Sequence, residues 1–160
     1  MKKKFFIGLF IFAAIGLFIF AHTVLRHNAQ VEQAQQPALQ APIEIPATGI
    51  LSLEEAVKSD KPVLAMFYVD WCTYCRRFMP MFGLFSLAYK DKFAFAAINC
   101  ENPEMKEIVE KYNVYGYPTV YIIDKKLDYE YSLNPMLFSD QENIKKELEK
   151  YLKLRAKVLK

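Results

Sequence analysis

Histidine is nearly missing from this sequence of 160 residues, and cysteine is scarce. The two histidines are His22 and His27, and the three cysteines are Cys72, Cys75 and Cys100. A structural zinc site needs four ligands, commonly four cysteines or two cysteines and two histidines. The part of the chain after His27 can supply neither set. A zinc site there would need carboxylates or a second chain, and we expect no metal.

A large excess of charge is also absent from most of the chain. Residues 47–160 hold 17 lysines and arginines against 16 aspartates and glutamates, a net charge of +1. The rest of the formal net charge of +3 belongs to the first 46 residues. Proteins that follow a phosphate backbone are strongly basic. We therefore expect no nucleic-acid partner.

Charged side chains are missing from the apolar run that extends from Phe5 to Leu25. Three lysines precede this run and Arg26 closes it. A helix of about 21 residues is roughly 30 Å long, the thickness of the hydrocarbon core of a bilayer. We therefore expect residues 1–27 to be an uncleaved transmembrane anchor, with a signal peptide as the alternative. The lysines favour a cytoplasmic N-terminus, so both interpretations export the residues that follow.

The next segment, residues 28–49, is rich in glutamine, alanine and proline and has no sustained periodicity. Such a composition predicts a flexible linker. It would join the membrane segment, residues 5–25, to a domain that covers residues 50–160.

Residues 50–160 alternate between helical and extended patterns, which predicts an α/β domain. Ser52 and Glu55 form a capping box that starts a short helix. The other predicted elements are strands over residues 63–69, 93–99, 118–124 and 128–133, and helices over residues 72–89, 102–112 and onward from a second capping box, Ser139 and Glu142. Strands separated by helices pair in parallel, and the last two strands form an antiparallel hairpin. We expect a mixed sheet of about four strands flanked by helices.

Cys72 and Cys75 stand where the first predicted strand ends and a helix begins. Functional sites in open α/β sheets lie at this end of the strands. A cysteine at a helix N-terminus meets unpaired N–H groups and the positive end of the helix dipole, which favour a thiolate. Cys72 could therefore attack a substrate disulfide, and Cys75, one turn later, could resolve the mixed disulfide.

Two other uses of the cysteine pair remain open at this point. Soft sulfur ligands suit Cu(I), so Met79 or Met81 could complete a copper clip, although methionines at this spacing more often fill a core. A permanent disulfide would close a very short loop and would therefore stabilise the chain little.

The stretches FYVDWCTYCRRFMP and NVYGYPT resemble the thioredoxin superfamily over residues 52 to about 153. The first is similar to the C-terminal thioredoxin-like domain of the transmembrane reductase DsbD, and the second to protein disulfide isomerase domains. The resemblance implies a thioredoxin fold in which Cys72 is the nucleophile, Cys75 the resolving cysteine and Pro118 a cis-proline facing them. Substrate contacts are then expected from Trp71, Thr73, Tyr74, Tyr117 and Pro118. A reversible Cys72–Cys75 disulfide would be the redox group, with no further cofactor.

The sequence departs from the pattern of this superfamily at several positions. Thr73 and Tyr74 replace the Gly-Pro of thioredoxins and the Gly-His of disulfide isomerases, so the direction of electron flow stays open. Met66 stands where thioredoxin has a buried aspartate that serves proton transfer, and Ala96 stands near the position of its lysine partner. Both halves of that buried pair are missing.

Charged neighbours of the cysteine pair are expected to act in opposite directions. Asp70 should lie at the rim, where its negative charge opposes a thiolate at Cys72, whereas Arg76 and Arg77 should favour one. The third cysteine, Cys100, is expected to be a core residue or an inert thiol, with a secondary redox or regulatory thiol as the alternative.

The sequence predicts an exported, membrane-anchored thiol–disulfide oxidoreductase, and we favour the reductase direction. We expect a single-pass protein of the bacterial inner membrane whose domain faces the periplasm. Its partners would be disulfide-containing clients and a transmembrane electron donor of the DsbD type. The alternatives are an oxidase or isomerase, or a client-binding module in which Tyr74, Tyr115, Tyr117 and the proline surface form a peptide groove.

Overall fold

The computed structural model describes residues 18–26, 41–46 and 49–160. Ala41–Lys160 form one of two compact units of the chain, and residues 18–26 form a helix in the other. The predicted anchor lies outside the described residues except for this helix, and so do most residues of the predicted linker. Within the described ranges, no helix has both the length and the apolar character needed to span a bilayer.

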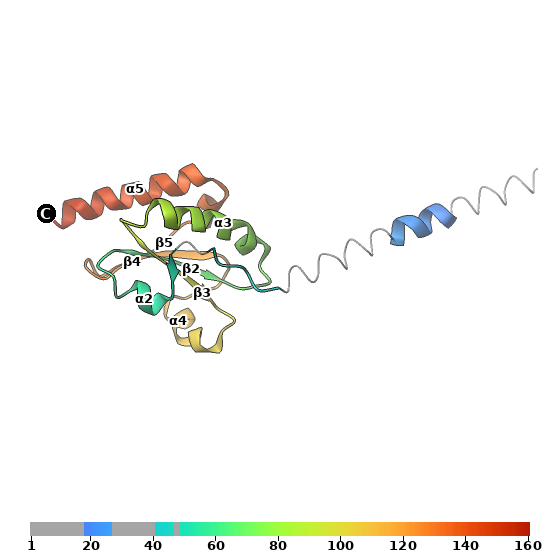
Figure 1. The fold of residues 1–160 in the computed structure, drawn as a ribbon, viewed down its shortest axis with the longest axis horizontal. Helices are drawn as coiled ribbons and strands as arrows, with labels where there is room; N and C mark the ends of the chain where they lie inside the picture. The colour runs from blue at the N-terminus through green and yellow to red at the C-terminus, as the bar shows by residue number, and fades with distance from the viewer. Residues whose placement is uncertain (1–17, 27–40, 47–48) are drawn as a thin grey trace, which may run out of the picture. The chain divides into compact units, whose positions relative to one another are not determined.

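Five strands form the central sheet, one more than the sequence predicts (Figure 1). Their order is β1-β3-β2-β4-β5, and their bounds are β1 Ile50–Leu51, β2 Val63–Tyr68, β3 Ala94–Asn99, β4 Thr119–Asp124 and β5 Tyr129–Ser132. Strand β3 is parallel to β1 and β2, whereas β4 is antiparallel to β2 and β5. The predicted mixed sheet with an antiparallel hairpin at one edge is confirmed. The missed strand β1 has only two residues, too few to show a periodicity.

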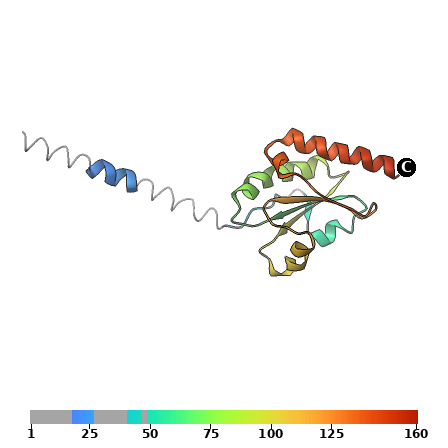
Figure 2. The ribbon, with the colours of Figure 1, turned by 180° about the vertical axis from the view of Figure 1, so that it is seen from behind.

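Helices cover both faces of this sheet, and each face has its own core (Figures 1 and 2). α3 (Thr73–Ala88) and α5 (Gln141–Val158) lie on one face, and α2 (Leu53–Ala56) and α4 (Lys106–Lys111) lie on the other. Phe82 of α3 and Leu148 of α5 are fully buried in the first core, and Ala56 of α2 is fully buried in the second. All six side chains of β2 are buried, as its uninterrupted apolar run predicts. The sheet therefore holds the end of β2 rigidly, and the cysteine pair follows there.

Two helix starts differ from the prediction. The N-cap of α5 is Asp140, whose side chain accepts a hydrogen bond from the Glu142 N–H at 2.9 Å. Ser139 instead belongs to a 3-10 helix, η2 (Pro135–Ser139), and its hydroxyl donates to the Met136 carbonyl. Asn102 does cap a helix, but this is another 3-10 turn, η1 (Pro103–Met105), which precedes α4. In contrast, the capping box of Ser52 and Glu55 is confirmed.

Residues 41–46, which the sequence places in the linker, pack against the domain, and we call them the strap. Ile43 is buried in the core on the α3 face. Its main-chain N–H donates to the Asp70 carboxylate at 2.7 Å. This contact joins residues 27 positions apart in the chain, and the composition of the segment gives no sign of it. The domain therefore starts before residue 50.

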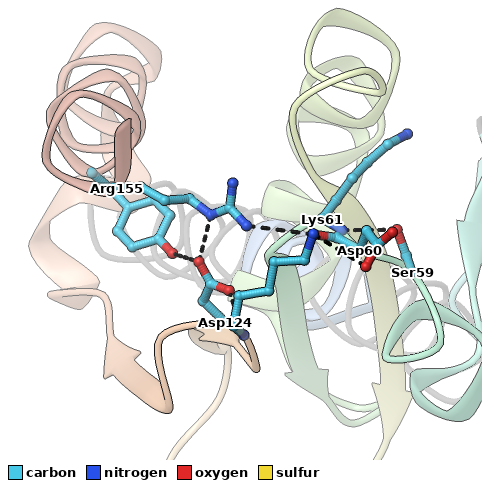
Figure 3. Close-up of polar contacts among 7 residues, drawn as sticks. Ser59, Asp60, Lys61, Asp124 and Arg155 are labelled. Carbon is cyan, nitrogen blue, oxygen red and sulfur yellow. Dashed lines mark hydrogen bonds and ion pairs between the residues drawn. The ribbon is translucent and has the colours of Figure 1, made fainter. Parts of the chain in front are cut away.

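A polar cluster ties α5 to the sheet at the end of β4 (Figure 3). The Asp124 carboxylate is almost fully buried and accepts hydrogen bonds from the Tyr151 hydroxyl at 2.6 Å and from Arg155 Nε at 2.5 Å. Arg155 also donates to the Asp60 carbonyl at 3.4 Å, and Lys126 Nζ lies 3.2 Å from the Asp60 carboxylate. The register pairs Val63 with Ile123, so the cluster lies at the opposite end of β2 from the cysteine pair.

Candidate functional site

Cys72 occupies the N-cap position of α3, directly after β2 and its connecting turn. Its backbone is extended, and its sulfur accepts a hydrogen bond from the Cys75 N–H at 3.1 Å. One of the unpaired N–H groups at the helix start thus points at the sulfur, and the helix dipole acts in the same direction. A helix N-terminus of this kind is where nucleophilic cysteines are commonly found.

Cys75 is the more deeply buried cysteine of the pair. Its exposed fraction is 0%, against 5% for Cys72. Burial, followed by a hydrogen bond with Cys72, raises the pKa of the Cys75 thiol above its ordinary value. The two sulfurs are therefore unequal in the way that a nucleophile and a resolving thiol must be. Both are free thiols in the structure, and their disulfide stays a prediction.

The loop before β4 faces the cysteine pair. The Tyr117–Pro118 peptide bond is cis, and the Cys72 thiol donates a hydrogen bond to the Tyr117 carbonyl at 3.5 Å. Trp71 is 60% exposed and makes an edge-on contact with the ring of Tyr117, with 6.1 Å between ring centroids. The structure therefore brings together Trp71, Cys72, Tyr117 and Pro118 from two distant parts of the chain. Thr73 and Tyr74 are exposed on the first turn of α3.

Buried apolar side chains occupy the two positions of the missing acid–lysine pair. Met66 on β2 and Ala96 on β3 have exposed fractions of 0%. In the described part of the chain, the groups that set the pKa of Cys75 are Cys72, the Val69 backbone and Cys100, and none of them is a carboxylate. Among the described residues, no carboxylate is thus one of the main influences on the pKa of Cys75.

Asp70 makes hydrogen bonds that its position in the sequence does not indicate, and its expected effect on Cys72 stays a prediction. Its carboxylate accepts hydrogen bonds from Ile43 N at 2.7 Å and from Asn99 Nδ2 at 2.9 Å. Arg76 turns toward the same region, and its Nη2 donates to the carbonyls of Ala41 and Asp70. Asp70 and Arg76 thus hold the strap beside the site. Sequence reasoning missed Ile43 and Asn99, because their contacts with Asp70 are long-range.

Cys100 is the third free thiol and lies just after β3. Its N–H donates to the Tyr68 carbonyl at 2.8 Å, and its side chain packs against both cores. Burial raises the pKa of the Cys100 thiol to about 11. A raised pKa favours the protonated thiol at neutral pH, and the packing against both cores agrees with a core residue.

The methionines of the copper alternative lie along α3 beyond the pair. Met79 is 1% exposed in the core, and Met81 packs against that core. Their positions agree with gap-filling side chains. Among the described residues, no group of three histidine, cysteine, aspartate or glutamate side chains could hold a metal ion.

A groove with a volume of about 1040 Å³ opens next to the pair. Its walls come from α3, from the loop before β4 and from η2. Tyr74, Tyr117 and Pro118 line it, as does Tyr115, the remaining tyrosine of the client-binding alternative. The wall formed by η2, with Met136 and Phe138, was not predicted, because nothing in that stretch marks a binding role.

Comparisons with known proteins agree with this geometry. The family model described as Thioredoxin matches residues 50–150. Protein disulfide-isomerase A5 of Bos taurus is 40% identical over 68 residues, which cover 42% of this chain and 13% of that protein. The thiol:disulfide interchange protein TxlA of Synechococcus elongatus is 32% identical over 85 residues, which cover 53% of this chain and 44% of TxlA. The chain thus spans less than half the length of either relative.

A solved structure shows the same fold. The Trx4 domain of ERdj5 superposes with a TM-score of 0.54 over 67% of this chain and 97% of that domain, at 22% sequence identity. The sheet order, the cysteine pair after β2 and the family model over residues 50–150 agree with one another. The chain therefore belongs to the thioredoxin family.

Proposed function

We propose that this protein is a thiol–disulfide oxidoreductase that exchanges disulfides through Cys72 and Cys75. The observation that carries the proposal is that the two sulfurs lie in different environments. Cys72 Sγ accepts an N–H at a helix start and lies 3.5 Å from the Tyr117 carbonyl, whereas Cys75 is fully buried with a raised pKa. In this proposal Cys72 attacks the client first, and Cys75 reacts only after a mixed disulfide has formed.

The proposed reaction transfers two electrons from the cysteine pair to a client. The Cys72 thiolate attacks one sulfur of the client disulfide, the client S–S bond breaks, and its other sulfur leaves as a thiolate. Cys75 then loses its proton and attacks Cys72 Sγ. The Cys72–Cys75 disulfide forms, and the client leaves as a dithiol. Reduction of the pair by an external dithiol completes the cycle.

We also propose that the protein acts as a reductase and that it is anchored in a membrane. The apolar run over residues 5–25, preceded by lysines, supports an anchor, and the similarity to a thiol:disulfide interchange protein supports the exchange chemistry. An oxidising compartment outside the cytoplasm would require a membrane electron donor of the DsbD type to keep the pair reduced. The domain would then face the periplasm of a bacterium.

Trapping of the mixed disulfide tests the chemistry. A Cys75→Ala variant cannot resolve the intermediate, so client proteins should accumulate as adducts through Cys72. These adducts should appear on non-reducing gels and disappear with reductant. Cys72→Ser should form none, and Cys100→Ser should behave like the wild type. An absence of adducts in Cys75→Ala would overturn the proposal.

The direction of electron flow is tested by a separate measurement. A redox potential close to that of thioredoxin, about −270 mV, together with rapid reduction of insulin, would support a reductase. A potential near −120 mV would instead indicate an oxidase.

Fractionation tests the anchor. The full chain should stay with membranes after alkaline carbonate extraction, and deletion of residues 1–27 should release it. Recovery of the full chain in the soluble fraction would remove the membrane part of the proposal and leave the chemistry untouched.

The groove favours one further candidate, a module that holds clients without redox chemistry. Its large apolar lining could bind a peptide without the cysteines. A Cys72→Ser, Cys75→Ser double variant separates the two cases, because it should lose function in cells if the chemistry matters and keep function if binding alone suffices.

A further inference from the structure

The groove beside Cys72 extends well past the cysteines. Most of its lining comes from three segments far apart in the chain, namely α3, the loop before β4 and η2, and strands β4 and β5 supply the rest. Phe138 of η2 stacks on Phe78 of α3, with 4.7 Å between ring centroids, and Phe78 is buried. The η2 wall is thus anchored to the core and holds a fixed distance from the cysteine pair.

Apolar side chains on the rim of the groove are unusually exposed. The exposed fraction is 91% for Tyr115, 81% for Met136 and 70% for Tyr74. Large apolar side chains that gather around one hollow on a surface mark a place of interaction. Methionine and tyrosine are suited to contact bulky side chains of varied shape.

The charge on the groove has one sign. Arg77 is the single charged residue among those that line it. It is exposed on α3, and none of the ion pairs among the described residues includes it. An unpaired guanidinium beside apolar surface complements a ligand that carries both a carboxylate and a bulky apolar group.

The position of Arg77 on α3 indicates how far this positive charge lies from Cys72 along the helix. Arg77 is five residues after Cys72 along α3, which corresponds to roughly 7.5 Å of helix rise. An extended peptide covers that length in about two or three residues at ~3.3 Å each. A client side chain two or three residues from the cysteine that reaches Cys72 would therefore lie level with Arg77 along the axis of α3, and Arg77 lines the groove.

We infer that the groove selects client segments that carry a carboxylate and a bulky apolar side chain within two or three residues of the exchanging cysteine. This inference rests on the proposed oxidoreductase function and specifies its substrate class. Tyr115 and Met136 would contact the apolar side chain, and Arg77 would pair with the carboxylate. Arg77 is here a specificity-determining residue and takes no part in the exchange reaction.

Synthetic peptides test the selection with the full-length reduced protein. Each peptide has nine residues with a central cysteine capped as a disulfide with 2-mercaptoethanol, and leucine or glycine beside it. Glutamate, glutamine or lysine is placed two or three residues away on either side. At low salt, kcat/KM should be about tenfold higher for the best glutamate peptide than for its lysine counterpart, and about threefold higher than for glutamine. The preference should shrink at 1 M salt, because exposed charges are then screened.

Variants with matched charge changes test which residues cause the peptide preference. Arg77→Glu should reverse the preference between the glutamate and lysine peptides. Lys90→Glu, which makes the same charge change beyond the far end of α3, should leave it unchanged. Met136→Ser should raise KM for leucine peptides several-fold and leave glycine peptides unaffected.

A small neutral disulfide, bis(2-hydroxyethyl) disulfide, separates failure of this inference from failure of the proposed function. If the protein reduces neither this compound nor any peptide, the oxidoreductase proposal fails. If it reduces the compound but all peptides react equally, or Lys90→Glu acts as strongly as Arg77→Glu, the selection is overturned.

Discussion

Cys75 shows most clearly how a single side chain depends on its surroundings. Its thiol is fully buried, and burial is the largest cause of its raised pKa. In thioredoxin-like sites a buried acid can assist this thiol, but here the corresponding position is Met66. Because no carboxylate of the described residues is a main influence on the Cys75 pKa, we expect the proton to leave without help from one.

This predicts a resolving step that is limited by pH. The Cys75 thiolate fraction rises with pH as long as pH stays below the raised pKa. The rate at which a preformed mixed disulfide at Cys72 is resolved should increase about tenfold per pH unit from pH 7 to 9. Stopped-flow measurement of client release would show this, with circular dichroism to check that the protein stays folded. A rate that levels off below pH 8 would contradict the prediction.

Asp70 is a second residue whose role depends on its contacts. Its carboxylate binds the main chain of the strap and the Asn99 side chain. Replacement by alanine leaves both donors without this acceptor, so Asp70→Ala should lower the free energy of unfolding by about 1–3 kcal/mol. Urea unfolding measures the change.

Asp91→Ala is the control for this prediction. Asp91 is exposed on the turn before β3, and replacing it should change stability by less than about 0.5 kcal/mol. Equal effects of the two substitutions would show that the strap contacts contribute nothing.

At the level of elements, α5 depends on the N-cap residue that precedes it. Asp140 supplies the N-cap hydrogen bond, whereas the Ser139 hydroxyl faces the preceding 3-10 turn. Asp140→Ala should therefore destabilise the protein by about 1 kcal/mol, and Ser139→Ala by clearly less. Thermal unfolding of both variants shows which residue caps α5. A larger loss of stability for Ser139→Ala than for Asp140→Ala would identify Ser139 as the cap.

The attachment of α5 to β4 predicts a response to acid. Burial opposes ionisation of Asp124, but hydrogen bonds from Arg155 and Tyr151 outweigh it and lower the pKa of the carboxyl. A lowered folded-state pKa contributes stability that is present above the unfolded pKa, near 3.9, and is lost as pH falls through the folded value.

Comparison with an Asp124→Asn variant isolates this contribution. At pH 7 the substitution should cost about 3 kcal/mol, because Arg155 loses its partner in a mostly buried setting. The difference in unfolding free energy between the two proteins should shrink as pH falls below about 4. A difference that stays constant down to pH 2 would argue against an ionised Asp124 in the folded protein.

For the molecule as a whole, the parts that sequence could predict are those set by local patterns. The apolar run of β2 and the Ser52 cap were read directly from neighbouring residues. The spacing of Cys72 and Cys75 predicted that they act as a pair, and the resemblance to the thioredoxin superfamily placed Pro118 opposite them. The strand β1 was too short to show a pattern. Ser139 and Asp140 are adjacent and both residue types cap helices, so the sequence did not show which of them caps α5.

The other missed features depend on contacts between distant segments. Nothing near Ile43 indicates that Asp70 binds it, and nothing near Met136 indicates that η2 forms a groove wall with α3. These contacts arise only once the sheet has placed the ends of its strands. The region that packs as one unit, Ala41–Lys160, is accordingly longer than the region matched by the family model, residues 50–150.

The location of the Asp124 cluster has a consequence for genetics. Because the cluster and Cys72 lie at opposite ends of β2, changes in one need not disturb the other. Substitutions at Asp124 would lower the amount of folded protein in a cell and leave each surviving molecule fully active. Substitutions at Cys72 would leave abundance unchanged and remove activity. Raising expression should therefore rescue the first kind of mutant but not the second.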